Sequence, residues 1–187
     1  MKDEDKTTFG VARKVLLEVR KALVGAKDTV MSLFLGVQCR GHLKVTLDYG
    51  THQVVHLDKK NLVVKNGRQL LLAPLYLTGR VSDPVSTLRV GSGGTLDVNG
   101  QFPKTPVVDT SALYSQTLST PTSYTYDSSR PSVTYLADIS ETQGNGTMIS
   151  EAGLFTVAGI MFNIKTFGGI PKTSAFSIHF EWTIAVI

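Results

Sequence analysis

The sequence predicts a mainly β protein, an antiparallel β-sandwich with an N-terminal helical arm. Apolar and polar residues alternate with period two over residues 176–186, the pattern of a long strand with one buried face. Several shorter apolar runs are separated by Gly- and Pro-rich turns, as in sandwich folds. One segment near the start, residues 8–24, instead has the spacing of an amphipathic helix.

The length and composition indicate one globular domain with an extension. The chain has 187 residues, of which 42% are hydrophobic and 18% are charged, unlike the highly charged composition of disordered chains. We expect residues 1–40 to form the helical arm and residues 41–187 to form the sandwich, with long loops over 92–131. The one cysteine, Cys39, excludes an intrachain disulfide and is expected to be a small buried hydrophobe.

The predicted arm contains an apolar stripe. Thr7 or Thr8 can cap the start of its helix, and Gly25 can end it. Its apolar residues recur at steps of three and four: Val11, Val15, Leu16, Val19, Ala22 and Leu23. Such a stripe is typical both of a helix that covers its own core and of an arm that docks on another subunit, and both interpretations stay open.

Strands and one short helix are predicted in the first half of the sandwich. Alternation over 43–49 indicates a half-buried strand, and residues 54–57 can pair with it across a turn at Gly50-Thr51. Residues 65–77 favour a short helix that Pro74 stops or kinks.

The second half, rich in Gly, Ser, Thr and Pro, predicts short strands between loops. A helix of one or two turns is expected over Ser111–Gln116, capped by Asp109 or Thr110, and residues 119–131 are expected to form a loop. A turn is expected at Gly144-Asn145-Gly146. The predicted strands are 87–90, 133–139, 147–154, 160–167 and 176–186.

The net charge of +4 is unevenly distributed. Residues 1–90 carry 15 Lys and Arg against 8 Asp and Glu, or +7, whereas residues 91–187 carry 4 against 7, or −3. A dipolar chain of this kind can pack head to tail with its own copies or bind an acidic partner. The basic residues lie among Leu and Val without interleaved aromatics, so a nucleic-acid role is not expected. The polar N-terminus and the short apolar runs predict neither a signal peptide nor a membrane span.

Motifs for catalysis and cofactor binding are weak. The serine-hydrolase pentapeptide Gly-x-Ser-x-Gly does not occur, and Gly91-Ser-Gly-Gly94 lacks the Lys-Ser/Thr of a phosphate-binding loop. Position 96 is Leu where the dinucleotide fingerprint needs Gly. We therefore predict a tight glycine turn, with no catalytic residues and no cofactor.

Metal and acid–base sites have only sparse candidates. His52 and His56 share one face at a spacing of four, but no third ligand is close in sequence, so no metal is predicted. His179 is expected to be exposed or interfacial. Glu141 and Glu151 are the two carboxylates that a glycosidase could use, although Glu151 is expected to bind loop amides or a neighbour's basic group instead.

Five motifs in fixed order carry a resemblance to a known class of domain. They are Leu88-Arg-Val-Gly-Ser-Gly, Asp109-Thr-Ser-Ala-Leu, Gly144-Asn-Gly-Thr-Met-Ile-Ser-Glu-Ala-Gly-Leu-Phe155, Ile170-Pro-Lys-Thr-Ser and Phe180-Glu-Trp-Thr-Ile. With them the C-terminal half resembles a β-sandwich domain that recurs in tail-fibre, collar and neck-associated virion proteins of tailed bacteriophages. A weaker likeness lies upstream, from Asn61 to Leu71.

The resemblance implies a domain without a substrate, whose specificity lies in the surfaces that meet. Gly144, Gly146 and Gly153 are then expected to be turn residues with positive φ. The aromatic core residues are expected to be Phe155, Phe162, Phe180 and Trp182.

The expected function is that of a non-enzymatic structural protein, made in the host cytoplasm and located in the virion. It would join subunits at the neck, collar, tail or fibre base. Its partners would be copies of itself and other virion proteins (portal, adaptor, tail or capsid), with no small-molecule substrate and no membrane.

Three alternatives stay open. A receptor- or glycan-binding module at a fibre tip would use exposed aromatic residues, with Tyr114, Tyr124, Tyr126 and Tyr135 as candidates. A capsid decoration protein would clamp its arm onto the shell. A depolymerase that uses Glu141 or Glu151 is the least favoured.

Overall fold

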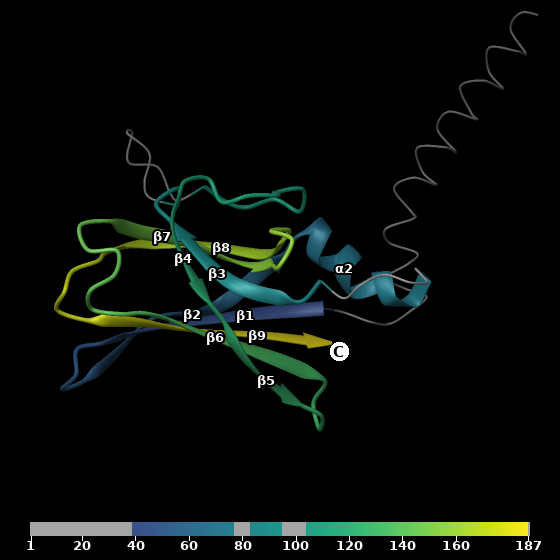
Figure 1. Cartoon of the computed structure of the whole chain (residues 1–187), viewed down its shortest axis with the longest axis horizontal. Helices are drawn as coiled ribbons and strands as arrows, with labels where there is room; N and C mark the ends of the chain where they lie inside the picture. Colours follow the sequence, from purple (N-terminus) through teal and green to yellow (C-terminus); the bar gives the residue numbers. More distant parts are fainter. Residues whose placement is uncertain (1–38, 77–82, 95–103, 187) are drawn as a thin grey trace, which may run out of the picture. The chain divides into compact units, whose positions relative to one another are not determined.

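The computed structural model describes residues 39–76, 83–94 and 104–186, and within them it is mainly β (Figure 1). The prediction of an antiparallel, mainly β fold is confirmed: nine strands form one antiparallel, nearly closed sheet. The residues of the compact unit run from Cys39 to Val186. The predicted helix over 8–24 and residues 1–38 of the predicted arm lie outside the described residues, whereas the last two residues of that arm, Cys39 and Arg40, belong to the first strand.

The strands follow one another along the chain with one helix between the second and the third. They are β1 (Cys39–Asp48), β2 (Gln53–Val63), α2 (Lys65–Tyr76), β3 (Val85–Gly91), β4 (Gln116–Pro121), β5 (Ser123–Asp127), β6 (Ser132–Ile139), β7 (Met148–Thr156), β8 (Met161–Pro171) and β9 (Ser177–Val186). Their order in the sheet is β4-β3-β7-β8-β2-β1-β9-β6-β5.

Strand β2 joins the two halves of this sheet. It pairs with β1 along most of its length, while its last two residues, Leu62 and Val63, pair with β8. The half β4-β3-β7-β8 therefore folds over the half β2-β1-β9-β6-β5, and the two layers are visible in Figure 1.

Strands β4 and β5 bring the two edges of the sheet together. Only Thr122 separates them, yet β4 pairs with β3 and β5 pairs with β6. The Thr122 amide donates to the carbonyl of Ser86 (3.0 Å), and the Thr120 hydroxyl donates to the carbonyl of Asp138 (3.1 Å). The chain thus crosses from one edge to the other at Thr122, and the sheet nearly closes.

The core lies between the two halves. In β9 the inward residues are buried and alternate with partly exposed ones, which confirms the strand predicted from its period-two pattern. The predicted aromatic core residues Phe155, Phe162, Phe180 and Trp182 are all buried. Of these, Phe155 belongs to a second, smaller cluster with Val64, Met161 and Ile164. One cluster contains residues from β1, β3, β6, β7, β8 and β9, so the two halves share a core.

Other local predictions are confirmed. Strand β1 and the hairpin partner β2 lie where the alternation placed them. The helix over 65–77 is present as α2, but Pro74 does not stop it, because α2 ends at Tyr76. Gly144 and Gly146 have φ of 68° and 81°, the left-handed conformation that favours glycine in turns.

Three local predictions are wrong. Ser111–Gln116 is not helical, because the amides of Tyr114 and Ser115 bind a carboxylate instead of turning into a helix. Most of the predicted loop 119–131, and so part of the loop region 92–131, belongs to β4 and β5. Gly153 lies inside β7 without positive φ, where an added Cβ would lie 2.8 Å from the Asn163 carbonyl oxygen.

Candidate functional site

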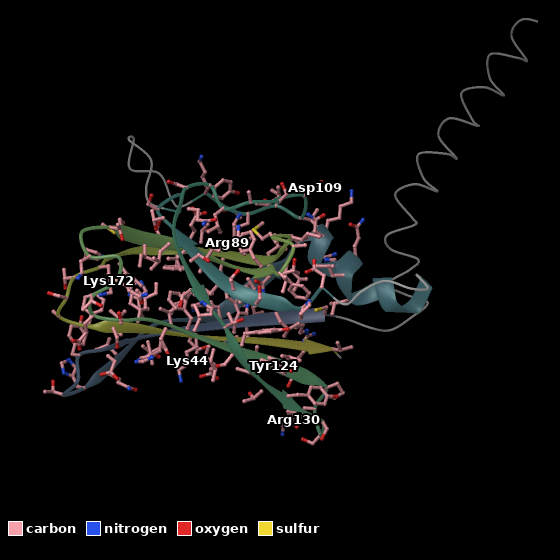
Figure 2. The ribbon with its side chains drawn as sticks, viewed as in Figure 1. Lys44, Arg89, Asp109, Tyr124, Arg130 and Lys172 are labelled. Atoms are coloured by element: carbon pink, nitrogen blue, oxygen red, sulfur yellow. The ribbon has the colours of Figure 1, made fainter. Side chains whose placement is uncertain are left out.

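Among the residues that the structure describes, the most exposed aromatic side chains lie on β5 at the edge of the sheet. All five residues of β5 are exposed, and Tyr124 and Tyr126 keep 68% and 63% of their surface accessible. Within the described part of the chain, β5 pairs with β6 alone. Figure 2 shows Tyr124 and Arg130 on this hairpin. Exposed aromatic residues on an unpaired strand edge are typical of an interaction surface.

This aromatic edge continues the face of the core. Tyr124 is paired with Tyr135 of β6, and their ring centroids are 6.3 Å apart. Tyr135 is in turn opposite Trp182, which is fully buried. Burial, and then the neighbouring Tyr124, raise the pKa of the Tyr135 phenol. The structure thus brings three of the four candidate tyrosines to one hairpin, and the fourth, Tyr114, lies elsewhere beside Lys104.

Glu151 is a buried carboxylate that holds two loops together. Its Oε1 accepts hydrogen bonds from the amides of Gly93 (3.0 Å) and Ser115 (2.7 Å), and its Oε2 accepts one from the amide of Tyr114 (2.9 Å). The side chain is fully buried. The expectation that Glu151 binds loop amides is therefore confirmed, and the carboxylate stabilises the loops that flank β3 and β4.

The glycine segment 91–94 contacts this carboxylate. A Cβ at Gly91 would lie 2.1 Å from the Ser115 carbonyl oxygen and 2.6 Å from Glu151 Oε1. A Cβ at Gly94 would lie 2.1 Å from the Ser150 carbonyl oxygen. Only glycine permits this close approach, and the amide of Gly93 binds the protein's own carboxylate.

Glu141, the second glycosidase candidate, lies in a different environment. It is exposed in the turn after β6, where its backbone carbonyl accepts a hydrogen bond from the Asn145 side chain (2.8 Å). Glu151 instead lies buried inside the sheet, where its carboxylate accepts hydrogen bonds from loop amides. The two carboxylates therefore lie in different environments and have different hydrogen-bond partners.

Lys172 connects two of the motifs that carry the phage resemblance, the one that begins at Gly144 and the one that begins at Ile170, through hydrogen bonds. Its Nζ donates to Thr173 O (2.6 Å), Asn145 Oδ1 (3.2 Å) and Glu141 O (3.4 Å). Its backbone carbonyl accepts from the Gly146 amide (2.9 Å). Burial lowers the pKa of Lys172, and the charge of Glu141 opposes this shift. Figure 2 labels Lys172 at the end of the sheet opposite α2.

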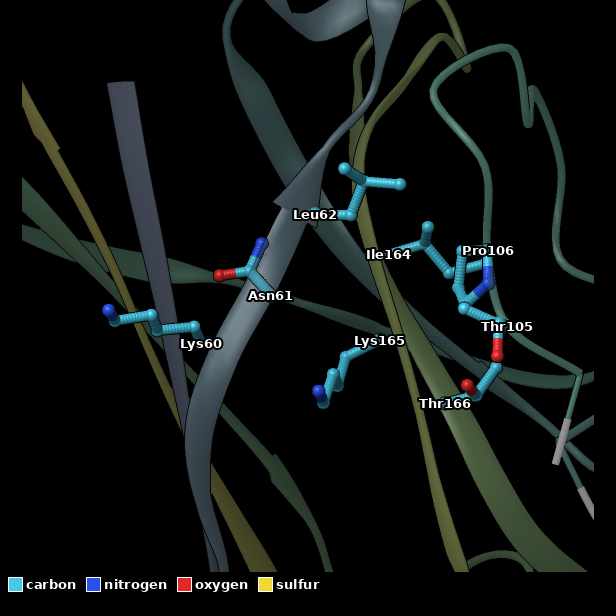
Figure 3. A pocket seen from close by; sticks show the side chains of 8 residues that line it. All are labelled: Lys60, Asn61, Leu62, Thr105, Pro106, Ile164, Lys165 and Thr166. Carbon is cyan, nitrogen blue, oxygen red and sulfur yellow. The ribbon is translucent and has the colours of Figure 1, made fainter. Parts of the chain in front are cut away.

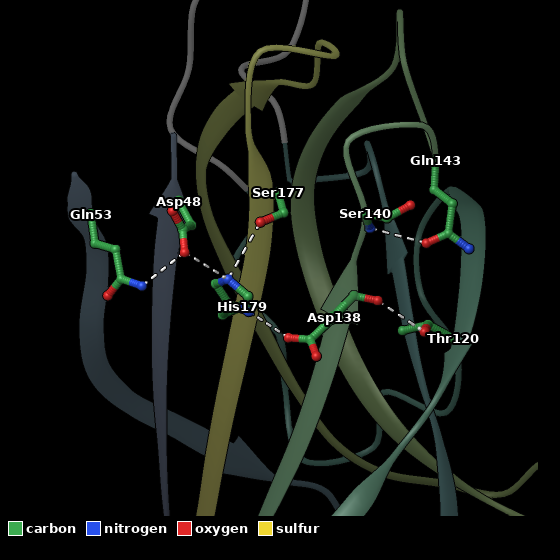
Figure 4. A network of polar contacts seen from close by, with 8 residues as sticks. All are labelled: Asp48, Gln53, Thr120, Asp138, Ser140, Gln143, Ser177 and His179. Atoms are coloured by element: carbon green, nitrogen blue, oxygen red, sulfur yellow. Dashed lines mark hydrogen bonds and ion pairs between the residues drawn. The ribbon is translucent and has the colours of Figure 1, made fainter. Parts of the chain in front are cut away.

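A row of polar residues crosses the outer face of β1, β9 and β6 (Figure 4). His179 Nδ1 lies 2.6 Å from Asp138 Oδ1, and its Nε2 lies 3.4 Å from Asp48 Oδ2. Hydrogen bonds from Gln53 and from the Gly50 amide lower the pKa of Asp48. The partly exposed position of His179 agrees with the expectation from its place in the alternation.

His52 and His56 contact different groups. His52 stacks on Tyr49 with ring centroids 4.9 Å apart, whereas His56 Nε2 lies 3.1 Å from the carbonyl oxygen of Gly168. Across residues 39–76, 83–94 and 104–186, the structure contains no group of three or more His, Cys, Asp or Glu side chains arranged to hold a metal.

A groove of about 460 Å³ lies between β2 and β8 (Figure 3). Two lysines, Lys60 and Lys165, line it together with Asn61 and Thr166. Burial, and then the charge of Lys59, lower the pKa of Lys165. The two lysines give this groove a basic lining.

Compared with known proteins, the chain significantly matches no protein family, no curated protein and no solved structure. The resemblance to phage virion domains therefore stays a prediction. Within the residues that the structure describes, no helix is long and apolar enough to cross a membrane.

Proposed function

We propose that this protein is a non-enzymatic structural subunit of a tailed-phage virion, which joins its neighbours at the neck, collar, tail or fibre base. The observation that carries the proposal is the exposed edge of β5, whose two tyrosines form an aromatic surface that a partner would cover. The order of motifs from Leu88 to Ile184 supports the phage assignment. The finer description of the fold as a β-sandwich domain with a docking arm belongs to the same proposal.

The contacts of the buried polar residues support a structural role. Glu151 and Lys172 each bind three groups of the protein itself, and those bonds fix loops and turns. Such fixed turns would present the surfaces by which subunits recognise one another.

Copy number in purified virions tests this proposal. Quantitative mass spectrometry, normalised to the portal protein of the same particles, should give a number of the same order as the portal. A copy number close to that of the major capsid protein would favour capsid decoration. Absence from the particle would reject the structural role.

A second candidate is a receptor- or glycan-binding module at a fibre tip, which the exposure of Tyr124 and Tyr126 favours, since carbohydrate-binding surfaces use exposed aromatic rings. Binding of the purified protein to host cells or host polysaccharide would support it. Replacing both tyrosines with Ser should then abolish binding, while replacing Tyr114 with Ser should not.

A further inference from the structure

We propose that the free edge of β5 pairs with the β5 edge of a second copy of this chain, antiparallel and about a two-fold axis through Thr125. This inference deepens the proposed assembly function, because it names the surface and the partner. Strand β5 is the last strand of the sheet order and has β6 on one side only among the described residues.

The β5 edge lacks three of the devices that usually block strand pairing: a lysine, a proline and a bulge. Natural edges are blunted by Lys, Pro or a bulge, or are covered by another segment. Residues Ser123 to Asp127 contain neither Lys nor Pro, and their register with β6 runs without a shift. No segment among residues 39–76, 83–94 and 104–186 pairs with the outer side of β5, so a second strand can bind its backbone groups there.

The sequence of β5, Ser-Tyr-Thr-Tyr-Asp, is nearly symmetric about its central residue. Antiparallel pairing centred on Thr125 places Tyr124 of each copy opposite Tyr126 of the other. It places Thr125 opposite Thr125, and Ser123 opposite Asp127. Aromatic pairs and Thr–Thr pairs stabilise antiparallel strands, and like charges do not meet.

The register follows from the faces of the strand. Tyr124 and Tyr126 point to one face, and Ser123, Thr125 and Asp127 point to the other, because successive side chains alternate. Pairing centred on Thr125 aligns the tyrosines of both copies on the side that continues through Tyr135 to the core. A shift by one residue would place each tyrosine opposite a threonine, serine or aspartate and split the aromatic surface.

A second copy fits this edge better than an unrelated strand, because each residue of β5 then lies opposite a suitable residue of the same sequence: Tyr opposite Tyr, Thr opposite Thr and Ser opposite Asp. The resulting interface is isologous, as in most two-fold dimers. With five residues from each chain it is smaller than a standard interface, so the isolated protein should be in a monomer–dimer equilibrium that depends on concentration.

Disulfide trapping tests the pairing. Opposed residues of antiparallel strands have Cα atoms about 4.5–5.5 Å apart, within the range that a disulfide spans. In a Cys39→Ser background, Thr125→Cys should form a disulfide dimer roughly tenfold faster than Val157→Cys. Val157 is a matched control, because it is 70% exposed and lies in a turn away from β5. Equal rates for the two variants would overturn the proposal.

A second pair of variants tests the register. Ser123→Cys and Asp127→Cys should each dimerise slowly alone and rapidly when mixed, because these two positions meet across the axis. Rapid dimerisation of Ser123→Cys alone would overturn the register. Each variant should first retain the buried fluorescence of Trp182, which shows that it has folded.

Removal of the aromatic pairs gives a readout without cysteines. The double variant Tyr124→Ser, Tyr126→Ser should shift the sedimentation equilibrium to the monomer, and an unchanged equilibrium would overturn the proposal. These tests use the purified full chain, so they are independent of the virion copy number. If the chain is absent from virions but its Thr125→Cys variant still forms the disulfide dimer, the assembly function is rejected while the β5 pairing is supported.

Discussion

At the scale of single residues, the buried carboxylate of Glu151 stabilises the loops beside β3 and β4 by accepting three backbone hydrogen bonds. Glu151→Gln keeps the size of the side chain but replaces one oxygen with an NH₂ group. That donor would face a backbone N–H, so at least one buried amide would lose its acceptor. We expect the free energy of unfolding to fall by about 2–3 kcal/mol in denaturant titration.

Glu141→Gln is the matched control for this substitution, because the Glu141 side chain is exposed and the hydrogen bonds from Asn145 and Lys172 go to its backbone carbonyl. Its effect should stay within about 0.5 kcal/mol. Equal effects of the two substitutions would contradict the role assigned to the amide bonds.

A second residue-scale prediction concerns Lys172, whose pKa burial lowers from its ordinary value of 10.5. The folded state disfavours the ammonium form, so between the folded pKa and 10.5 the unfolded chain binds more protons. The contribution of Lys172 to the free energy of unfolding therefore rises with pH across that window, and below the folded pKa the cost of burying the charge is fully present.

Nuclear magnetic resonance of the lysine Cε and Hε atoms, recorded as a function of pH, measures the pKa of Lys172 directly. Lys172 should titrate at a pH below 10.5, the ordinary value for a lysine, because burial lowers its pKa. Titration of Lys172 at or above 10.5 would show that burial does not destabilise its ammonium form.

At the scale of elements, the junction between β3 and the loop before β4 depends on the absence of a side chain at Gly91. Gly91→Ala would place a Cβ 2.1 Å from the Ser115 carbonyl oxygen. Because this oxygen belongs to the backbone, it cannot move away without a displacement of the main chain. We expect a loss of about 1–3 kcal/mol or more in the free energy of unfolding.

Gly168→Ala in β8 is the control for this element. Gly168 has no positive φ, and nothing lies within 4 Å of an added Cβ. Its effect should stay within about 0.5 kcal/mol. Thermal unfolding of both variants checks the difference, and similar melting temperatures would show that the loop accommodates the methyl group.

The elements also show what the sequence could predict. Strand β9 was predictable because one face is buried from Ile178 to Ile184, so its apolar residues alternate with polar ones there. Strand β5 carries Ser, Thr, Tyr and Asp, all of them exposed, so hydrophobic periodicity gives no signal there. Its pairing with β6 comes from tertiary structure, although the alternation of Tyr with small polar residues was a local hint.

Two site predictions illustrate the same limit. The turn at Gly144 and the amide-bound role of Glu151 followed from local residue types. The helix over Ser111–Gln116 failed because a capping signal was outweighed by Glu151, which lies far along the chain and binds the amides of Tyr114 and Ser115. A hydrogen bond between a backbone amide and a side chain far along the chain leaves no pattern in the local sequence.

At the scale of the whole molecule, the two halves of the sheet share one hydrophobic core, and this predicts that they unfold together. The cluster joins Leu88 and Leu154 of β3 and β7 to Phe180 and Trp182 of β9. Trp182 is the one tryptophan of the chain and is fully buried. Its fluorescence therefore reports on the half that contains β9, whereas Leu154 belongs to the other half.

Leu154→Ala should lower the free energy of unfolding by about 2–5 kcal/mol, because it leaves a cavity in the core. If the halves are one cooperative unit, the Trp182 fluorescence transition should move by the same amount as the loss of β-sheet circular dichroism. A fluorescence midpoint that stays in place while the circular dichroism midpoint shifts would mean that the half with β9 folds by itself. Coincident shifts would mean that the nearly closed sheet is a single folding unit. Strand β2 and the crossing from β4 to β5 would then connect the two halves firmly. Such a unit can present the exposed β5 edge to a partner in a fixed orientation.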